Sequence, residues 1–176
     1  MAPSAMTTRL QLTLFLPGPA AERVEAVRRT LDPVQLNLIP AHVTLCREDE
    51  LEGLGPALLR QRLAASGIRP LTLVFGSAQE FSTHGVLLPC ISGEEEFRAL
   101  REVVLGSETI RLQQPHITLA HPRNPKAPGN NLAAAASLAS GLKARLTSIC
   151  LIQQAGSAPW QVLERIELAA AEGSDA

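Results

Sequence analysis

The sequence has few aromatic residues and few cysteines. Its 176 residues include no tyrosine, one tryptophan, four phenylalanines and three cysteines. The cysteines are Cys46, Cys90 and Cys150, which are odd in number, widely spaced and set among apolar residues. This pattern argues against a disulfide scaffold and against a CxxC metal or redox motif. It predicts buried free thiols in a reducing compartment.

The sequence also lacks an excess of either charge and any long apolar run. A net charge of −1 argues against the broad basic face that coats long nucleic acid, but a few local cations could still hold a short RNA end or a nucleotide. The apolar segment at residues 9–16 is too short for a membrane span, and Gln11 and Thr13 interrupt it in alternation, as in a strand. We therefore expect a cytoplasmic protein with no membrane partner and no obligatory protein partner.

Hydrophobic periodicity predicts a mixture of strands and helices. Apolar alternation predicts strands at residues 9–16, 42–46, 71–75, 85–91, 116–119, 143–153 and 160–168. Helical spacing ended by glycine or proline predicts helices at residues 20–31, 54–65, 93–105 and 132–140, the last of them capped by Asn131. Residues 122–130 are expected to form a loop. The chain up to about Thr8 and from residue 169 onward is expected to fray.

The order of these elements repeats along the chain. A strand, a helix, a short strand, a helix and a strand occur twice, and two similar tetrapeptides lie 74 positions apart, near half the length of the domain. Internal duplication with approximate two-fold symmetry explains both observations. We therefore predict one α+β domain over residues 1–176, made of two pseudo-symmetric lobes with mostly antiparallel strands.

The two tetrapeptides read His-Val-Thr-Leu at residues 42–45 and His-Ile-Thr-Leu at residues 116–119. In a strand, residues i and i+2 project from the same face. Each motif therefore places its histidine and its threonine on one side and its two apolar residues on the other. The two-fold symmetry would set the two polar faces opposite each other across one cleft.

This arrangement suits phosphoryl chemistry without a metal ion. Imidazole titrates near neutral pH, so one of His42 and His116 can take a proton from water while the other gives a proton to the leaving oxygen. Thr44 and Thr118 can donate hydrogen bonds to non-bridging phosphate oxygens as charge develops there. The motif strands offer no carboxylate on the polar face, so the usual metal ligands are missing. Pseudo-symmetry leaves open which histidine is the acid and which is the base.

The paired motifs resemble those of the two-histidine (2H) phosphoesterase superfamily, in particular the RNA 2′,3′-cyclic phosphodiesterases that are also called 2′-5′ RNA ligases. The resemblance covers nearly the whole chain, from the first strand to residues 149–168, which are similar to the closing hairpin of the family. It implies a bilobal fold in which two sheets flank a central cleft, with helices on the outside. It also implies hydrolysis of a terminal 2′,3′-cyclic phosphate to a 2′-phosphate, with 2′-5′ joining as a further activity and with no metal or organic cofactor.

The sequence departs from the family pattern just after each motif. The first motif continues as Cys-Arg-Glu-Asp at residues 46–49, where the family often has Phe-Leu-Gly. In the second, His121 stands where many members have an arginine, and Arg47 holds the equivalent position in the first copy. A phosphate-clamping arginine has therefore moved or been replaced. Arg47, His121 and Arg123 are the candidate substrate contacts.

Recognition of a base would need a ring on which to stack. Phe15, Phe81 and Trp160 are the candidates, and core packing is the alternative for each. His84 falls in a turn at residues 82–85 and is expected to be exposed.

Two other functions stay open. The same chemistry could act on a small nucleotide, such as an ADP-ribose cyclic phosphate, because the modest charge of the chain favours short substrates. The fold could also serve as a nucleotide-binding module without catalysis, although both histidines and both threonines are intact.

Overall fold

The computed structural model describes residues 6–123, 132–139 and 141–169. Its strands are β1 (Thr8–Phe15), β2 (His42–Cys46), β3 (Leu71–Phe75), β4 (Gln79–Phe81), β5 (Gly85–Ser92), β6 (His116–Ala120), β7 (Leu142–Leu146), β8 (Ser148–Ala155) and β9 (Gln161–Glu167). Its helices are α1 (Gly18–Leu31), α2 (Pro33–Leu38), α3 (Pro56–Ser66) and α4 (Glu94–Leu105), with two 3-10 segments, η1 (Glu48–Glu50) and η2 (Leu132–Leu138).

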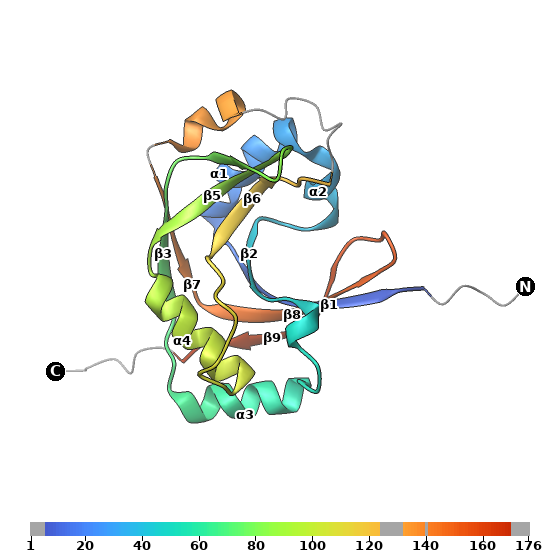
Figure 1. Cartoon of the computed structure of the whole chain (residues 1–176), viewed down its shortest axis with the longest axis vertical. Coiled ribbons are helices and arrows are strands. Elements are labelled where there is room, and N and C mark those ends of the chain that lie inside the picture. Colours follow the sequence, from blue (N-terminus) through green and yellow to red (C-terminus); the bar gives the residue numbers. More distant parts are fainter. Residues whose placement is uncertain (1–5, 124–131, 140, 170–176) are drawn as a thin grey trace, which may run out of the picture.

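The motif strands β2 and β6 lie at the centre of a curled sheet (Figure 1). The strand order is β7-β3-β5-β6-β2-β1-β8-β9, with β4 paired to β5, and every described pair is antiparallel. One half of the sheet is β7-β3-β5-β6 and the other is β2-β1-β8-β9. The two halves join where Val43 on β2 pairs with Ile117 on β6. The predicted α+β fold is therefore confirmed, and the two predicted sheets are the two halves of one continuous curled sheet.

The helices lie on the outside of the sheet, above and below it in Figure 1. Helix α1 follows β1 in the chain but packs against β6 and β7, which belong to the other half of the sheet. Helix α4 follows β5, and it packs against β2 of the other half as well as β3 of its own. Helices α1 and α4 therefore tie the two halves together.

The motif strands divide their side chains between core and cleft as predicted. Val43, Leu45, Ile117 and Leu119 are fully buried, whereas both histidines and both threonines of the motifs keep part of their surface exposed. All three cysteines are buried and free, as predicted. Burial raises the pKa of the Cys46 thiol to about 12, so this residue stays protonated and is a poor nucleophile.

Two element predictions were wrong, and one helix was missed. The predicted helix at residues 20–31 does end at Leu31, but Pro33 begins the unpredicted helix α2, because proline fits the first turn and the Asp32 side chain accepts a hydrogen bond from the Gln35 N–H (3.1 Å). The single strand predicted over residues 143–153 is two strands, β7 and β8, which break at Thr147 and pair with opposite halves of the sheet. The alanine-rich segment forms the 3-10 segment η2 and not an α-helix.

The ends of the chain and one loop are described only in part. Strand β1 already begins at Thr8, which was predicted to be loose. The predicted helix cap Asn131, most of the predicted loop (residues 124–130) and most of the predicted fraying tail (residues 170–176) lie outside the described residues.

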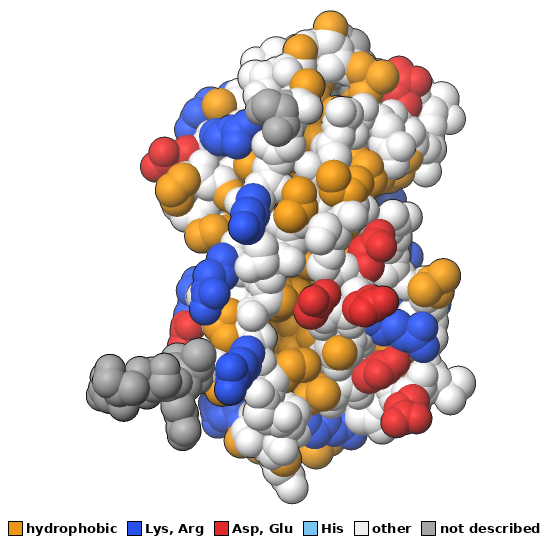
Figure 2. Space-filling view, turned by 90° about the vertical axis from the view of Figure 1, so that its left-hand side faces the viewer, with side chains coloured by type: hydrophobic (Ala, Val, Ile, Leu, Met, Phe, Trp, Pro, Cys, Tyr) orange, Lys and Arg blue, Asp and Glu red, His pale blue; other side chains and the backbone are white. Residues whose placement is uncertain are grey.

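The face of the molecule that carries β3, β7 and α4 is mixed in character. Acidic and basic side chains lie among apolar and uncharged ones there, and no broad patch of one charge covers the described residues of this face (Figure 2). This agrees with the net charge of −1. Within the described ranges, no helix is long and apolar enough to cross a membrane.

Val43 tests the junction between the two halves, because it is fully buried and pairs with both Leu14 and Ile117. Val43→Ala should lower the free energy of unfolding by about 2 kcal/mol, since it removes buried apolar surface and leaves a cavity. Urea unfolding measures the loss. The matched control is Val162→Ala on β9, where the side chain is 51% exposed and the change should stay within about 0.5 kcal/mol. Equal losses in the two variants would contradict this view of the junction.

Candidate functional site

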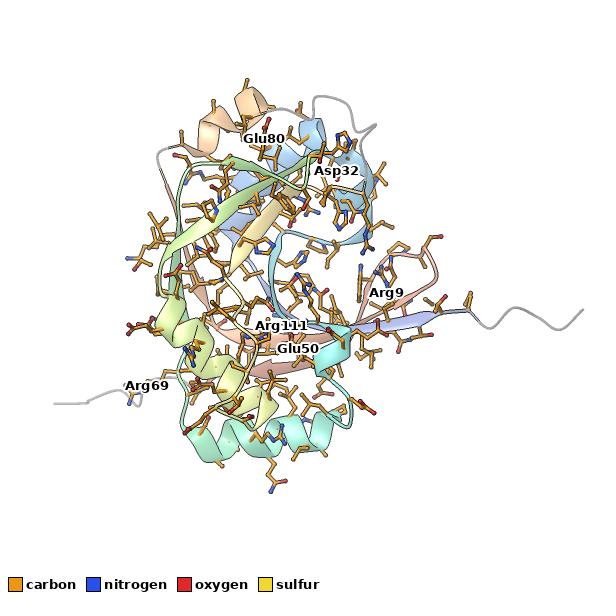
Figure 3. The ribbon with its side chains drawn as sticks, in the orientation of Figure 1. Arg9, Asp32, Glu50, Arg69, Glu80 and Arg111 are labelled. Carbon is orange, nitrogen blue, oxygen red and sulfur yellow. The ribbon has the colours of Figure 1, made fainter. Side chains whose placement is uncertain are left out.

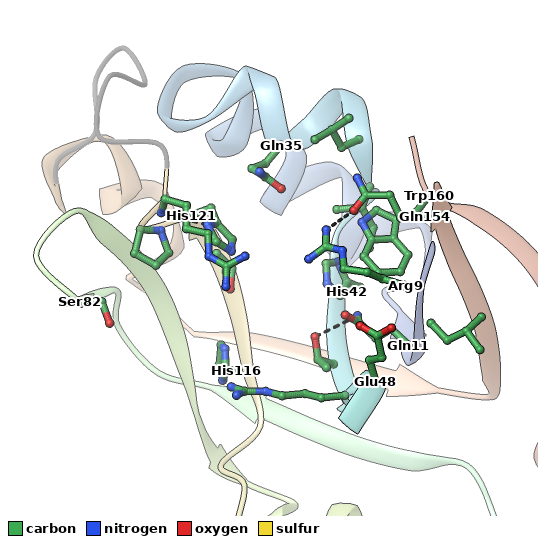
Figure 4. A pocket seen from close by; sticks show the side chains of 18 of the residues that line it. Arg9, Gln11, Gln35, His42, Glu48, Ser82, His116, His121, Gln154 and Trp160 are labelled. Carbon is green, nitrogen blue, oxygen red and sulfur yellow. Dashed lines mark hydrogen bonds between the residues drawn. The ribbon is translucent and has the colours of Figure 1, made fainter. Parts of the chain in front are cut away.

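A cleft of about 780 Å³ opens between β2 and β6 (Figure 4). Most of the predicted site residues line it. They are His42, Thr44, Arg47, Phe81, His116, Thr118, His121, Arg123 and Trp160. The two motifs, 74 positions apart in the sequence, therefore meet in one cavity that is large enough for a nucleotide.

The two motif histidines have matching surroundings. His42 Nδ1 lies 2.8 Å from the carbonyl oxygen of Pro40, and His116 Nδ1 lies 3.1 Å from that of Gln114. In each case the acceptor is two residues before the histidine. Because a carbonyl only accepts, Nδ1 must carry a proton, and in a neutral ring the lone pair is then on Nε2. Each ring can thus exchange a proton through Nε2.

An aromatic ring lies beside each histidine. The Phe15 ring centroid is 6.3 Å from that of His42, and Phe81 is at the same distance from His116. Phe81 is among the residues that line the cleft, whereas Phe15 is not and instead packs on a small apolar cluster that contains Ile39. Phe15, predicted as a substrate contact, therefore lies behind His42.

The protonation of His42 is shifted by its surroundings. Burial lowers the pKa of His42 to about 4, although the hydrogen bond to Pro40 works in the opposite direction. The charges of Arg28 and His116 lower this pKa further. At neutral pH the His42 ring is consequently uncharged and can accept a proton.

The two motif threonines occupy matching positions. Each lies two residues after its histidine, on the same face of the strand. Thr44 and Thr118 are both half-buried and line the cleft. The Thr44 hydroxyl oxygen accepts a hydrogen bond from the Gln11 side chain (3.2 Å), shown as a dashed line in Figure 4. Since its oxygen accepts there, its hydrogen can be donated to a group in the cleft.

His121 is held from two sides near the cleft wall. Its backbone N–H donates to Asp32 (2.9 Å), and its Nδ1 accepts from the backbone N–H of Arg123 (3.1 Å). Burial, followed by the charge of Arg123, lowers the pKa of His121. Because Nδ1 is an acceptor here, the neutral ring carries its proton on Nε2 and is a hydrogen-bond donor.

A buried arginine connects the two motifs. Arg101 on α4 is 1% exposed and donates to the Leu45 carbonyl, to Glu50 (2.6 Å) and to the side chain of Gln113 (3.0 Å). Gln113 in turn donates to the Thr44 carbonyl (2.8 Å). Gln113 is three residues before His116, so these contacts link the backbone of the first motif to the chain that enters the second.

Glu50 also contacts the neighbouring loop. Its carboxylate accepts from the backbone N–H of Arg47 (2.9 Å) and lies 3.6 Å from Arg111, beside which it appears in Figure 3. Arg111 in turn bonds Asp49 (3.1 Å). The segment after the first motif is thus fixed by charge pairs.

Sequence reasoning missed Arg9, Gln11, Arg28 and Gln113, all of which line the cleft. A signal existed for Arg9 and Gln11, because alternation along one strand places them on the face of β1 that also carries Thr13. A signal also existed for Arg28, which is four residues after Val24 and three before Leu31 on the buried stripe of α1. Gln113 lies in an irregular segment with no such periodicity.

The described parts of the chain contain no group of three or more His, Cys, Asp or Glu side chains that could hold a metal ion.

Known proteins resemble the chain in family and in fold. A family model described as the 2′-5′ RNA ligase superfamily matches residues 16–158. No curated protein matches the chain by sequence. Among solved structures, E. coli LigT complexed with ATP has a TM-score of 0.60 and 19% identity, covering 94% of this chain and 99% of that one.

Two further structures agree in fold. A protein described only as a phosphoesterase has a TM-score of 0.57 and 18% identity, with coverage of 93% of this chain and 100% of that one. E. coli LigT complexed with 3′-AMP has a TM-score of 0.53 and 18% identity, with coverage of 93% and 99%.

Replacement of Arg101 tests the connection between the motifs. Arg101→Met should lower the free energy of unfolding by about 3 kcal/mol, because it removes the donor to the buried Leu45 carbonyl and the buried ion pair with Glu50. The matched control is Arg98→Met on the same helix, whose exposed pair with Glu102 contributes at most about 0.5 kcal/mol. Denaturant unfolding of both variants measures the difference. Equal stability of the two would show that the buried network contributes little.

Proposed function

Because the chain belongs to the 2′-5′ RNA ligase superfamily, we propose that it is a phosphodiesterase that opens the terminal 2′,3′-cyclic phosphate of a short RNA to leave a 2′-phosphate. The observation that supports this most directly is the matched pair of histidines in one cleft. Each is held through Nδ1 by the carbonyl two residues before it. Two imidazoles that both exchange protons through Nε2 suit a reaction with one proton removed and one delivered.

His42 is assigned as the base. Its pKa of about 4 leaves the ring neutral at pH 7, so Nε2 can take a proton from a water molecule as the water oxygen bonds to phosphorus. The P–O3′ bond breaks, and protonated His116 delivers its Nε2 proton to O3′. The phosphate then remains on O2′. A 5′-hydroxyl in place of the water would form a 2′-5′ bond through the same two proton transfers.

The threonines and the arginines of the cleft stabilise charge on the phosphate. Thr44 and Thr118 donate to the non-bridging oxygens, which become more negative in the transition state. Arg47 and Arg123 supply positive charge from opposite motifs and hold the substrate as a whole. A cleft of about 780 Å³ has room for the nucleoside as well as the phosphate. E. coli LigT, of the same fold, was crystallised with 3′-AMP and with ATP.

The length of the substrate can be measured directly. A cyclic-phosphate-ended oligonucleotide and a cyclic mononucleotide would be compared over a range of salt concentrations. Turnover of the oligonucleotide should fall more steeply with salt, because more phosphates contact cations. A preference for the mononucleotide at every salt concentration would indicate a small-nucleotide enzyme.

Replacement of either motif histidine should abolish most of the activity. We expect His42→Ala and His116→Ala each to lower kcat by about 10²–10⁴, the usual contribution of one proton transfer. The control is His84→Ala, because His84 is exposed and does not line the cleft. Steady-state turnover of a 2′,3′-cyclic nucleotide provides the measurement. If nucleotides bind but wild-type protein turns over no cyclic phosphate at any pH, the chain is a binding module and the proposal fails.

The acidic side of the pH profile should report His42. The base is active when neutral, so kcat/KM should stay high as pH falls below 6.5 and decline only as it approaches about 4. A profile of kcat/KM from pH 3.5 to 9 tests this, with far-UV circular dichroism to confirm that the protein remains folded. The residual activity of His42→Ala should lose that acidic limb. A limb centred near 6.5 would contradict the assignment of His42 as the buried base.

A further inference from the structure

One end of the cleft contains a cation–π pair, Arg9 and Trp160, that the proton-transfer chemistry does not use. Trp160, the only tryptophan of the chain, lies just before β9 and lines the cleft. Its backbone N–H donates to the Leu38 carbonyl (2.9 Å), and its side chain packs on the apolar cluster that contains Ile39 and Ile152. The indole is therefore held in place from behind.

Arg9 lies over this ring. Its guanidinium carbon is 5.3 Å from the Trp160 ring centroid, and the group also donates to the side-chain oxygen of Gln154. Gln154 is only 3% exposed, and its amide nitrogen donates to the Ala158 carbonyl (2.8 Å). Since the amide nitrogen is committed there, the oxygen faces Arg9, so a buried and oriented side chain fixes the guanidinium.

Arg9 itself is exposed and lines the cleft. With Trp160 on one side, the planar guanidinium of Arg9 has another side open to whatever enters the cleft. Phosphate recognition needs donors that converge on a point, whereas a flat cationic surface suits a nucleobase, which stacks on arginine planes and on aromatic rings. The alternative is that the pair only stabilises the β8–β9 hairpin, as many exposed cation–π pairs do.

The pair of Arg9 and Trp160 lies on the wall that carries His42. Trp160 and Phe15 pack on the same apolar cluster, and the Phe15 ring is 6.3 Å from that of His42. Figure 4 shows Arg9, Gln154 and Trp160 together beside His42, across the cleft from His116. A nucleoside that extends from a phosphate between the histidines along the His42 wall would therefore meet this pair.

We propose that Arg9, held by Trp160 and Gln154, is a stacking platform for a nucleobase of the substrate. This inference rests on the proposed function for the position of the phosphate. It assigns Arg9 a role that depends on the shape of the guanidinium and not only on its charge.

Arg9→Lys separates shape from charge, because lysine keeps the positive charge but has no plane. Two substrates are compared: a nucleoside 2′,3′-cyclic phosphate and ribose 2′,3′-cyclic phosphate, which has no base. We expect Arg9→Lys to raise KM for the nucleotide about tenfold while leaving KM for the base-free compound and both kcat values nearly unchanged. The matched control is Arg145→Lys, an exposed strand arginine on β7 outside the cleft, which should alter neither KM.

A third substrate, a dinucleotide that ends in a cyclic phosphate, tests whether the platform binds the base next to the reacting nucleotide. A tenfold effect already present with the mononucleotide assigns the platform to the base of the reacting nucleotide. An effect that appears only with the dinucleotide assigns it to the neighbouring base. Unchanged KM for both in Arg9→Lys overturns the platform, and so does an equal rise for the base-free compound.

A binding measurement keeps this test independent of turnover. Trp160 is the only tryptophan, so the tryptophan fluorescence of the whole protein reports the platform. A nucleoside 2′-monophosphate should change this fluorescence in the wild type and much less in Arg9→Lys, whereas ribose phosphate should have little effect on either. If that pattern holds in a protein that turns over no cyclic phosphate, the platform stands and the proposed reaction fails. Identical responses to the two ligands overturn the platform whatever the activity.

Discussion

The structure depends on one short pairing between the two strands that carry the motifs. β2 and β6 pair at Val43 and Ile117, and beyond this point the two halves of the sheet diverge. Divergence is what opens a cleft with a histidine on each wall. It also removes the partners that a longer strand pair would give to backbone groups, and buried carbonyls without partners are costly. The side chains of Arg101 and Gln113 donate hydrogen bonds to the Leu45 and Thr44 carbonyls, in place of the backbone donors that a longer strand pair would supply.

The two halves of the fold repeat their buried charged residues as well as their motifs. Arg28 and Arg101 occupy the same place on the buried stripes of α1 and α4, each four residues after an apolar residue (Val24, Phe97) and three before another (Leu31, Val104). A carboxylate accepts the backbone N–H of the residue five positions after each motif histidine, Glu50 for Arg47 and Asp32 for His121. The duplication thus extends to the charged groups beneath the cleft.

The sequence predicted those features that follow from a regular period. Alternation along β2 and β6 placed both histidines correctly, because the side-chain period of a strand is fixed by its backbone. The break at Thr147 could not be predicted, since apolar alternation continues through it and only tertiary pairing separates β7 from β8. Arg101 stands at an apolar position of a helical stripe, so its burial was detectable. Its partners Glu50 and Gln113 were not, because irregular segments bring them there.

The symmetry of the cleft is broken where its charges differ. Arg28 lies close enough to lower the pKa of His42, whose ring burial already favours the neutral form. After the motifs, Arg47 is an exposed cation, whereas His121 is partly buried and its pKa is lowered. Its Nδ1 is occupied by the Arg123 N–H, so the neutral ring offers the cleft one donor and no charge. Two walls built on the same plan therefore present different electrostatics to the cleft, and this difference is what would separate the proposed base, His42, from the proposed acid, His116, on a backbone that treats them alike.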